Sequence, residues 1–361
     1  MKKVYDLIVI GGGAGGTSAA ITARRNGKEV LIVEKEDKLG KKILMTGNGK
    51  CNLSNADMRP CFYNTDFVAE TIKIDVPGFF RSLGLRVKEI GGRFYPYSES
   101  ALSAVSFLRK NYDGELVLGE EVKSVDEKGG LFSVNGYLGK NVLLATGSNA
   151  TKGTESGYLY EKFGHTTEKR RPSLVPLVTD TADIKGLSGL RAKCSLTLYE
   201  NGEKKETEKG ELLFKDNGLS GIVSMSISAY VARRQKKCDV AIDFAPDLTA
   251  EEVKESVKTG GAESLLHKAI AQSVEKQAAR RGLSVAETVK NFVVKNVRTG
   301  DVRQAQAVCG GLVTSEFDEN MQSKKKKGLY ACGEVLDVDG QCGGYNLHFA
   351  FASGIKVGMS I

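Results

Sequence analysis

The sequence predicts an α/β protein whose first domain is built on a parallel sheet and is interrupted by an inserted second domain. Two glycine-rich turns, each placed between an apolar run and a helical pattern, lie near the two ends of the chain. Between them, short alternating runs indicate antiparallel strands and are followed by a polar helical stretch. We therefore expect residues 1–177 and 302–361 to form the first domain, and the insertion 178–301 to be β-rich over 178–246 and helical over 247–301.

The composition is that of a globular protein with an ordinary core. Of the 361 residues, 41% are hydrophobic, which is enough to fill more than one core. The net charge of +8 suits an anionic ligand, but most basic residues are interspersed with acidic ones, so charge alone does not indicate nucleic acid. The run from Lys324 to Lys327 precedes a strand pattern and is typical of a solvated hairpin loop, with a partner-binding patch as the alternative.

Cysteines, histidines and the N-terminal residues exclude several classes of protein. Seven cysteines without a C-x-x-C pair, and only three histidines, indicate neither a disulfide framework nor a zinc site, so we expect no metal. The first apolar run ends at Ile10, too early for a signal peptide, and no stretch is long enough to span a membrane. We expect a reduced, cytoplasmic protein that does not contact a membrane.

The first forty residues have the pattern of a strand, a helix and a second strand. Val4–Ile10 and Val30–Val33 are short apolar runs, and the residues between them have helical spacing. In the turn G-x-G-x-x-G, Gly11 permits a tight bend, Gly13 lets a pyrophosphate approach the backbone, and Gly16 lets the helix pack on the strand. The position of the motif between a strand and a helix favours a dinucleotide-binding fold over a purely structural turn.

The start of this helix and the end of the second strand complete the expected dinucleotide contacts. Backbone N–H groups at Ala14 and Gly15 would hold the phosphates. Glu34, followed by Lys35, ends the second strand, where its carboxylate can accept hydrogen bonds from an adenosine ribose. A carboxylate there favours FAD or NAD over a 2′-phosphorylated cofactor.

Further elements follow along the chain. We expect a helix and a short hairpin within 79–98, a helix over Ser98–Asn111, and successive strands over 114–148. In the insertion, Thr249 with Glu252 three residues later is a capping-box pattern that begins a helix.

A second glycine-rich segment distinguishes between the two dinucleotides. Residues 328–354 have the pattern of a strand, an acidic pair at Glu334 and Asp337, and a glycine turn that opens a helix at Tyr345. A second helix start is a second group of backbone donors for an anion. Nicotinamide binding needs no such distant element, whereas an extended FAD needs a polar partner for its ribityl chain and positive charge near its reduced ring. We therefore expect FAD.

At this point the chain resembles a known family over nearly its whole length. The residues that carry the resemblance are "GGGAGG" at 11–16, "TGNGKCNLSN" at 46–55, "RFYPYSESA" at 93–101, "LLATGS" at 143–148, "GELLF" and "GLSG" within 210–221, and "GLYACGEVLDVDGQCGGYNL" at 328–347. The chain is similar to the FAD-dependent oxidoreductases of the aminoacetone oxidase and BaiN (YhiN-like) type, a branch of the glutathione-reductase-like flavoproteins. The resemblance implies one discontinuous FAD-binding domain of the Rossmann type with an inserted second domain.

The resemblance also implies which residues meet the cofactor, because in this wider class the segment after the ribose-binding acid passes under the flavin. Beyond the first motif and Glu34, the expected contacts are Lys42, Gly47, Gly49, Lys50, Cys51, Asn52, Val122, Ala145, Thr146, Gly147, Gly333, Glu334, Asp337, Gly344, Tyr345, Asn346 and Leu347. Cys51 could instead be a reactive thiol or a metal ligand. No second cysteine stands between Lys41 and Pro60, which favours the cofactor loop.

The expected cofactor sets the expected function. An FAD enzyme would transfer hydride between flavin N5 and a small-molecule substrate. Arg93, Tyr95, Tyr345 and His348 are the candidates to contact that substrate, and packing explains Tyr95 and His348 equally well. Only one G-x-G-x-x-G follows a strand, so NADH or NADPH would dock transiently as an electron donor.

Two other functions stay open at this point. One is an FAD-dependent protein that modifies nucleic acid or binds RNA, although the basic residues are too scattered for us to expect nucleic acid as a partner. The other is a flavin-binding protein without turnover. Neither the substrate nor the oligomeric state follows from the sequence.

Overall fold

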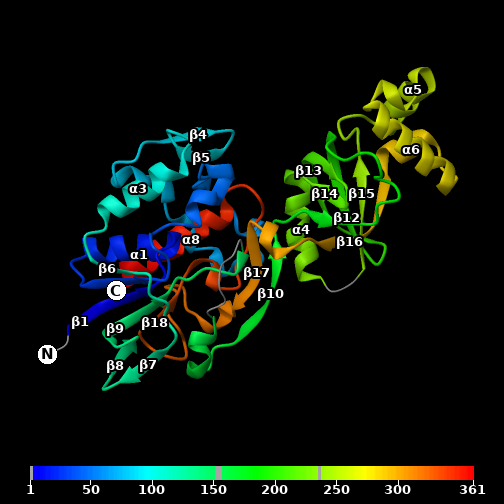
Figure 1. The fold of residues 1–361 in the computed structure, drawn as a ribbon. Coiled ribbons are helices and arrows are strands. Elements are labelled where there is room, and N and C mark those ends of the chain that lie inside the picture. The colour runs from blue at the N-terminus through cyan, green and yellow to red at the C-terminus, as the bar shows by residue number, and fades with distance from the viewer. Residues whose placement is uncertain (1–2, 151–156, 235–236) are drawn as a thin grey trace. The chain divides into compact units, whose positions relative to one another are not determined.

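The computed structural model describes residues 3–150, 157–234 and 237–361. The chain folds into two compact units (Figure 1). Unit 1 consists of Met1–Arg170 and Ala307–Ile361, and unit 2 of Arg171–Gln306. The chain therefore leaves unit 1 and returns to it, and the boundaries lie a few residues from those expected.

The centre of unit 1 is a twisted, mostly parallel sheet with the strand order β6-β2-β1-β9-β8-β7, and β18 pairs with β9 beside this path. The strands are β1 (Val4–Ile10), β2 (Val30–Glu34), β6 (Glu115–Leu118), β7 (Val125–Lys128), β8 (Leu131–Val134), β9 (Tyr137–Leu144) and β18 (Leu329–Ala331). Strands β6, β2, β1, β9 and β18 pair in parallel, whereas β7, β8 and β9 pair antiparallel. The expected Rossmann-type fold is confirmed.

The two helices that begin at glycine turns pack on each other in unit 1. They are α1 (Ala14–Arg25) and α8 (Tyr345–Ser360). An added Cβ at Gly354 would lie 2.1 Å from the Gly15 carbonyl oxygen, so a side chain at this crossing would force the helices apart. The close crossing brings the last segment of the chain against the first.

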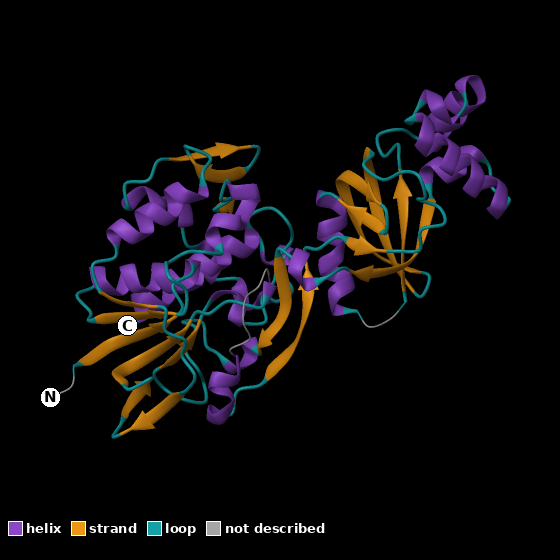
Figure 2. Ribbon diagram, in the orientation of Figure 1, coloured by secondary structure: helices purple, strands orange, loops and turns teal. Residues whose placement is uncertain are grey.

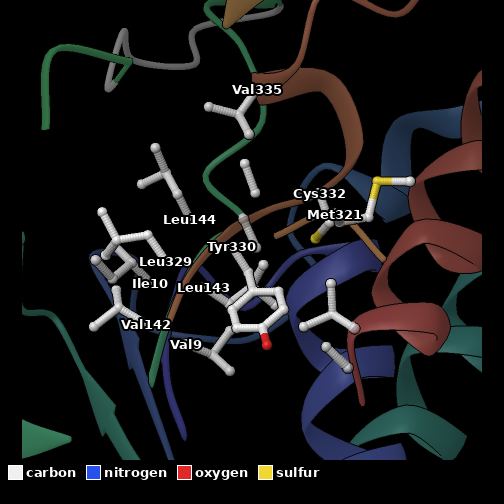
Figure 3. Close-up of a cluster of buried hydrophobic side chains, with 14 of the residues drawn as sticks. Val9, Ile10, Val142, Leu143, Leu144, Met321, Leu329, Tyr330, Cys332 and Val335 are labelled. Carbon is white, nitrogen blue, oxygen red and sulfur yellow. The ribbon is translucent and has the colours of Figure 1, made fainter. Parts of the chain in front are cut away.

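Apolar side chains of β1, β9 and β18 make the core under this sheet (Figure 3). Val9, Leu143 and Leu329 are fully buried within it. Since both faces of a parallel sheet are covered, its strands are continuous apolar runs rather than alternating ones. That pattern is why β1 and β2 could be placed from the sequence.

The remaining elements of unit 1 are short. They include the sheet β3 (Ser54–Asn55), β5 (Arg93–Pro96) and β4 (Val87–Ile90), the helices α2 (Val76–Ser82) and α3 (Ala101–Asn111), and the 3-10 turns η1 (Ile43–Gly49) and η10 (Gly333–Val335). Helix α3 begins three residues later than expected, because Ser100 has the extended backbone of an N-cap. Strands β10 (Thr167–Ser173) and β17 (Ala307–Leu312) form a two-stranded sheet where the chain passes between the units.

Unit 2 is a closed antiparallel barrel with the order β11-β14-β13-β12-β15-β16 (Figure 2). Its strands are β11 (Leu177–Val178), β12 (Arg191–Glu200), β13 (Glu203–Lys215), β14 (Gly218–Ser220), β15 (Cys238–Asp243) and β16 (Phe292–Thr299). Alternate residues of the strands fill the barrel, for example Leu196 and Leu198 of β12.

Helices accompany the barrel in a different order from the one expected. They are α4 (Ile222–Arg233), α5 (Ala250–Gly260), α6 (Lys268–Arg281) and α7 (Val285–Lys290). Helix α4 lies inside the stretch that we expected to be β-rich, and β16 lies inside the stretch expected to be helical. Sequence analysis missed β16 because the two strands with which it pairs, β11 and β15, are far from it in the sequence. The capping box of Thr249 and Glu252 at the start of α5 is confirmed.

Within the part of the chain that the structure describes, no helix is both long and apolar enough to cross a membrane.

Candidate functional site

In the turn between β1 and α1, Gly11 and Gly16 cannot be replaced by a residue with a side chain. Gly11 has φ = +103°, and an added Cβ there would lie 2.7 Å from the Ala145 carbonyl oxygen. An added Cβ at Gly16 would lie 1.9 Å from the Gly11 carbonyl oxygen. Both clashes are with backbone atoms, so neither can be relieved by moving a side chain. The turn is therefore held close to the end of β9, where Ala145 follows.

Gly13 is different, because an added Cβ there meets no atom within 4 Å. Gly13 is the N-cap of α1 and has no side-chain cap, and the first turn of the helix has no acidic residue. The N–H groups of Ala14 and Gly15 are among the first-turn donors that have no partner within a helix. This open space beside free donors and the positive end of the helix dipole suits a diphosphate.

Glu34 ends β2 with its carboxylate turned back towards the glycine turn. The side chain is 8% exposed, and its Oε2 accepts from the Gly12 N–H at 2.5 Å. Oε1 accepts from the Glu36 N–H at 2.9 Å. Since a carboxylate has about four acceptor positions, these two bonds fix the side chain and leave acceptors for ribose hydroxyls. Lys35, the next residue, is partly exposed.

The end of β9 and the segment after β2 meet at Lys42. Its Nζ donates to the Ser148 carbonyl oxygen at 2.9 Å and lies 3.7 Å from Glu334 Oε2. Burial lowers the pKa of Lys42, although Glu334 opposes the shift. Lys42 also lies near Gly147, which together with the partly exposed Thr146 follows Ala145. Thus a cation lies beside the loop at 145–147. Val122, one of the expected cofactor contacts, is 6% exposed.

The start of α8 contains an unsatisfied polar atom. Gly344, the N-cap of the helix, has φ = +103°, and its added Cβ would lie 2.9 Å from the Asn52 carboxamide. Asn52 Oδ1 is buried and has no hydrogen-bond partner among the residues that the structure describes. A buried acceptor without a donor costs about 1–3 kcal/mol, so its retention points to a donor that comes from a ligand.

Neighbouring residues hold this turn in place. The carboxamide of Asn346 accepts from the Gly340 N–H at 2.9 Å and donates to the Gly340 carbonyl at 2.8 Å. Leu347 is partly exposed and packs against the cluster that contains Cys51. Asn346 and Leu347 were both predicted to contact the cofactor; in the structure Asn346 closes the turn and Leu347 packs against this cluster, and their contact with the cofactor stays a prediction.

Glu334 and Asp337 both bind backbone groups of β17. Glu334 Oε1 accepts from the Val308 N–H at 3.0 Å, and its Oε2 accepts from Ser148 Oγ at 2.6 Å. Asp337 Oδ1 accepts from the Gly310 N–H at 2.9 Å. Gly333, just before the pair, has φ = +68° in η10. These bonds give both acids a structural function in addition to any ribityl contact.

The segment 47–51 contains three residues in the left-handed region, with φ values of 56° at Gly47, 82° at Gly49 and 57° at Cys51. The thiol of Cys51 is fully buried, and burial raises its pKa to about 12. A thiolate is the reactive form of cysteine, so this shift disfavours the reactive-thiol alternative. Lys50 is exposed and pairs with Glu99 at 2.9 Å, so it does not lie in the interior of the loop.

His348 was expected to contact substrate or to pack, and its surroundings favour packing. The ring is 3% exposed, Nδ1 lies 2.8 Å from Ser54 Oγ, and Nε2 lies 3.0 Å from the Ile72 carbonyl oxygen. Both ring nitrogens are therefore engaged by the protein. Burial lowers the pKa of His348 to about 4, so the ring stays neutral at neutral pH.

The other three substrate candidates lie close to the start of α8 or on the neighbouring hairpin. Tyr345 is 7% exposed and packs against Phe62, with ring centroids 5.0 Å apart. Burial raises the pKa of Tyr345, while the nearby charge of Arg93 lowers it in part. Arg93 and Tyr95 are partly exposed on β5, and Arg93 pairs in register with Asn55. The Asn55 side chain donates to the Gly343 carbonyl oxygen at 3.0 Å, which ties the hairpin to the glycine turn.

A Ser-His-Glu constellation elsewhere in unit 1 escaped the sequence analysis. His165 Nε2 lies 2.7 Å from Ser323 Oγ, and His165 Nδ1 lies 2.9 Å from Glu316 Oε2. This is the geometry of a hydrolase triad. However, Ser323 is 6% exposed and its Oγ also accepts from the backbone N–H groups of Lys325 and Lys326. The serine has no access to a substrate, so the group fastens the basic loop to unit 1.

The residues of unit 1 fit an FAD molecule. The open space at Gly13 suits the diphosphate, and the buried carboxylate of Glu34 suits an adenosine ribose. The buried acceptor of Asn52 matches the single N–H group of an oxidised flavin ring, and it lies at the positive end of α8. Sequence analysis predicted each of these residues, whereas Ser54 and Ser148 lie within the quoted motifs but were not singled out as site residues.

Comparison with known proteins agrees with this geometry. Residues 5–360 match the family described as HI0933-like protein Rossmann domain. The 3-dehydro-bile acid delta(4,6)-reductase of Clostridium scindens is 31% identical, over 97% of this chain and 97% of the relative. The ribosomal RNA dihydrouridine synthase of Haemophilus influenzae is 30% identical, over 100% of this chain and 99% of the relative. Among solved structures, the 3-ketosteroid-delta4-(5alpha)-dehydrogenase of Rhodococcus jostii shares the fold, with 16% identity, a TM-score of 0.51, and coverage of 100% of this chain and 97% of that one.

Proposed function

The chain belongs to the HI0933-like family and is an FAD-dependent oxidoreductase, and we propose that it reduces a carbon–carbon double bond conjugated to a carbonyl group. The observation that supports the proposal is a bond type shared by two relatives that match along their whole length. In a 3-dehydro-bile acid, delta(4,6) double bonds are conjugated with the 3-keto group, and dihydrouridine is uridine with the double bond next to a carbonyl saturated. In both, the carbon farther from the carbonyl is electron-poor and accepts a hydride.

The chain's contribution is to hold the cofactor and the charge that develops on it. When bound, FAD supplies the hydride through its N5 atom. The N–H groups at the start of α1 would bind the diphosphate, Glu34 would bind the adenosine ribose, and Asn52 would accept from the ring. The positive end of α8 would stabilise negative charge on the reduced ring, in the same way that an oxyanion hole stabilises a developing anion.

Reduction of the double bond also requires a proton at the carbon next to the carbonyl. We assign this proton to Tyr345, which lies at the start of α8 and whose phenol is protonated at neutral pH, since burial raises its pKa from an ordinary value that is already far above 7. Arg93 lies close enough to act on that pKa. His348 is a poorer candidate, because both ring nitrogens are engaged by Ser54 and Ile72.

An anaerobic titration tests the function. The purified yellow protein is reduced with NADH or NADPH, and then a conjugated enone or the matching isolated alkene is added. We expect flavin absorbance to return with the enone only, with one saturated product per flavin. Bleaching of the oxidised flavin by an amine would instead identify an oxidase and contradict the proposal. The same experiment identifies the electron donor.

The Tyr345→Phe variant distinguishes proton transfer from hydride transfer. We expect it to be reduced by the nicotinamide as fast as the wild type, but to transfer to the enone at least about tenfold more slowly, since general acid catalysis contributes roughly 100-fold or more. Equal rates for the enone would remove Tyr345 from the mechanism.

A second candidate substrate is uridine within RNA. It is favoured by one observation, the match along the whole chain with a ribosomal RNA dihydrouridine synthase. Because a uracil ring and a steroid enone present the same conjugated bond, one site can serve either chemistry. Adding a uridine-containing oligonucleotide as the third arm of the titration distinguishes the two.

A further inference from the structure

We propose that a basic hollow on unit 2 binds the phosphodiester backbone of RNA. The hollow has a volume of about 420 Å³ and is lined by side chains from four separate parts of unit 2. Its cationic residues are Arg171, Arg234, Lys237 and Arg298. No acidic side chain is among the described residues that line it.

The arrangement of these cations is not explained by the fold alone. Basic residues after the end of α4 are favoured by the helix dipole, which accounts for Arg234. The dipole does not account for Lys237, just before β15, or for Arg298, on β16. Like charges gathered in one hollow repel one another, so an anion that neutralises them stabilises the arrangement.

Among the described residues, the contact of Arg234 with an acidic side chain is weak. Arg234 Nε lies 3.8 Å from Glu200 Oε2, a long contact, and Arg234 Nη1 donates to the Tyr230 carbonyl at 3.0 Å. Asp239, close to the hollow, accepts from the Asn296 backbone N–H at 2.9 Å. Lys237 and Arg298 are exposed. The charges of the last two residues therefore face solvent at the rim of the hollow.

The rest of the lining suits a nucleic acid better than a small inorganic anion. Val231, Ala232 and Val297 give the hollow an apolar floor, and Asn296 and Thr299 add polar groups. A polyanion with sugar rings between its phosphates can use all three kinds of group. The choice of RNA among polyanions rests on the uridine candidate given above. Binding does not depend on flavin chemistry, so the two ideas can fail separately.

Salt dependence of RNA binding tests the proposal. A fluorescently labelled single-stranded RNA is titrated with the FAD-loaded protein at several salt concentrations. Four phosphate contacts predict a slope of log affinity against log salt of about −2.8, because each contact on a single strand contributes about −0.7. In the Lys237→Glu/Arg298→Glu variant we expect a slope of about −1.4 or shallower, with unchanged flavin absorbance and unchanged enone reduction.

The matched control is Lys324→Glu/Lys327→Glu, which changes the charge by the same amount in the basic loop of unit 1. Both lysines are exposed. We expect the control to retain the wild-type slope. Equal losses in the two variants would show that only net charge matters, and would overturn the proposal. Should the double charge reversal unfold unit 2, the neutral Lys237→Gln/Arg298→Gln variant replaces it.

Two further outcomes would also overturn the proposal that the hollow binds RNA. One is a slope of log affinity against log salt close to zero for the wild-type protein. The other is inorganic polyphosphate that competes as well as RNA at equal phosphate concentration, which would identify a general anion site. If RNA binds at the hollow but its uridines are not reduced, the RNA-binding surface stands and the uridine substrate fails.

Discussion

Unit 1 and unit 2 offer positive charge to an anion in two different ways. In unit 1 it comes from backbone N–H groups at the starts of α1 and α8, beside Gly13 and Gly344, and needs little net charge. In unit 2 it comes from side chains, in the hollow around Lys237 and Arg298. Backbone donors fix one ligand in one orientation, whereas flexible cationic side chains can hold a chain of phosphates in many orientations. The proposed cofactor site of unit 1 and the proposed RNA site of unit 2 therefore rely on different kinds of donor.

The largest effect is expected for a substitution that blocks the backbone N–H groups at the start of α1. Gly13→Val places a side chain in the open space beside the first turn of α1, where it meets no protein atom within 4 Å of Cβ. We expect a folded protein that binds FAD at least roughly 100-fold more weakly, about 2.8 kcal/mol. Circular dichroism and flavin absorbance must therefore diverge.

Gly16→Ala is the contrasting control for that substitution. Its Cβ would lie 1.9 Å from the Gly11 carbonyl oxygen, so we expect loss of the fold together with the flavin. A Gly13→Val protein that keeps its flavin would show that the diphosphate does not pass this turn.

Acid should weaken unit 1 before unit 2. His348 is buried in unit 1 with a pKa of about 4, whereas His267 of unit 2 is exposed. A histidine with a lowered folded pKa takes up protons in the unfolded chain first, so stability is complete above about pH 6.5 and is lost as the pH falls towards 4. The loss attributable to His348 is about 3 kcal/mol.

Hydrogen exchange at pH 7 and pH 5 measures this difference for each unit. We expect protection in α8 to fall at pH 5 while that of β12 and β15 changes less. His348→Gln should have lower stability at pH 7 but a flatter pH dependence. The same pH dependence in wild type and variant would remove His348 as the cause.

A smaller effect is expected for the acidic pair of unit 1, Glu334 and Asp337, which we expect near the ribityl chain of FAD. If Glu334 anchors the ribityl chain, Glu334→Ala should weaken FAD binding by roughly 1.5–3 kcal/mol, and Asp337→Ala should do less. Both acids also bind β17, through the Val308 and Gly310 N–H groups, so each variant needs a stability measurement beside its flavin titration. If Asp337→Ala loses more FAD at equal stability, then Asp337 is the anchor.

A smaller change confined to unit 2 tests whether the units are energetically separate. Thr249→Ala removes the capping box at the start of α5 and should destabilise unit 2 by about 1 kcal/mol. Flavin affinity should stay the same. The matched variant Ser284→Ala removes the second capping box, at the start of α7, and should behave alike. Loss of flavin in either variant would show that the barrel supports the cofactor.

The smallest effect is expected for Cys51→Ser. The thiol is buried and its pKa is raised to about 12, and serine can adopt the same backbone at no greater cost. We expect flavin affinity within about twofold of wild type, under roughly 0.5 kcal/mol, and most of the turnover. A variant that binds FAD but is no longer reduced would restore the reactive-thiol interpretation.

The features that could be predicted from sequence were those set by a few adjacent residues. The glycines at 11 and 16 mark the turn because local backbone geometry requires them, Gly13 belongs to the same short motif, and the capping box of α5 is equally local. The resemblance to the aminoacetone oxidase and BaiN group, drawn from such motifs, is confirmed. The assignments of single site residues remain predictions.

What escaped prediction depends on residues that are far apart in the chain. Strand β16 closes the barrel by pairing with β11 and β15, and its own short apolar run gave no sign of this. The hollow of unit 2 gathers Arg171, Arg234 and Arg298 from three places. The burial of His348 depends on Ser54 and Ile72, so the sequence left its packing and substrate interpretations equally open.

The close crossing of α1 and α8 has a consequence for how the protein is made. Helix α1 and strand β9 are synthesised before unit 2, while their partners α8 and β18 are synthesised after it. Translation at roughly 5–20 residues per second leaves those partners missing for many seconds. The barrel of unit 2, which is continuous in the chain, can close in that interval. If α8 contacts the flavin as we propose, FAD can bind only after α8 has been synthesised and has packed on α1.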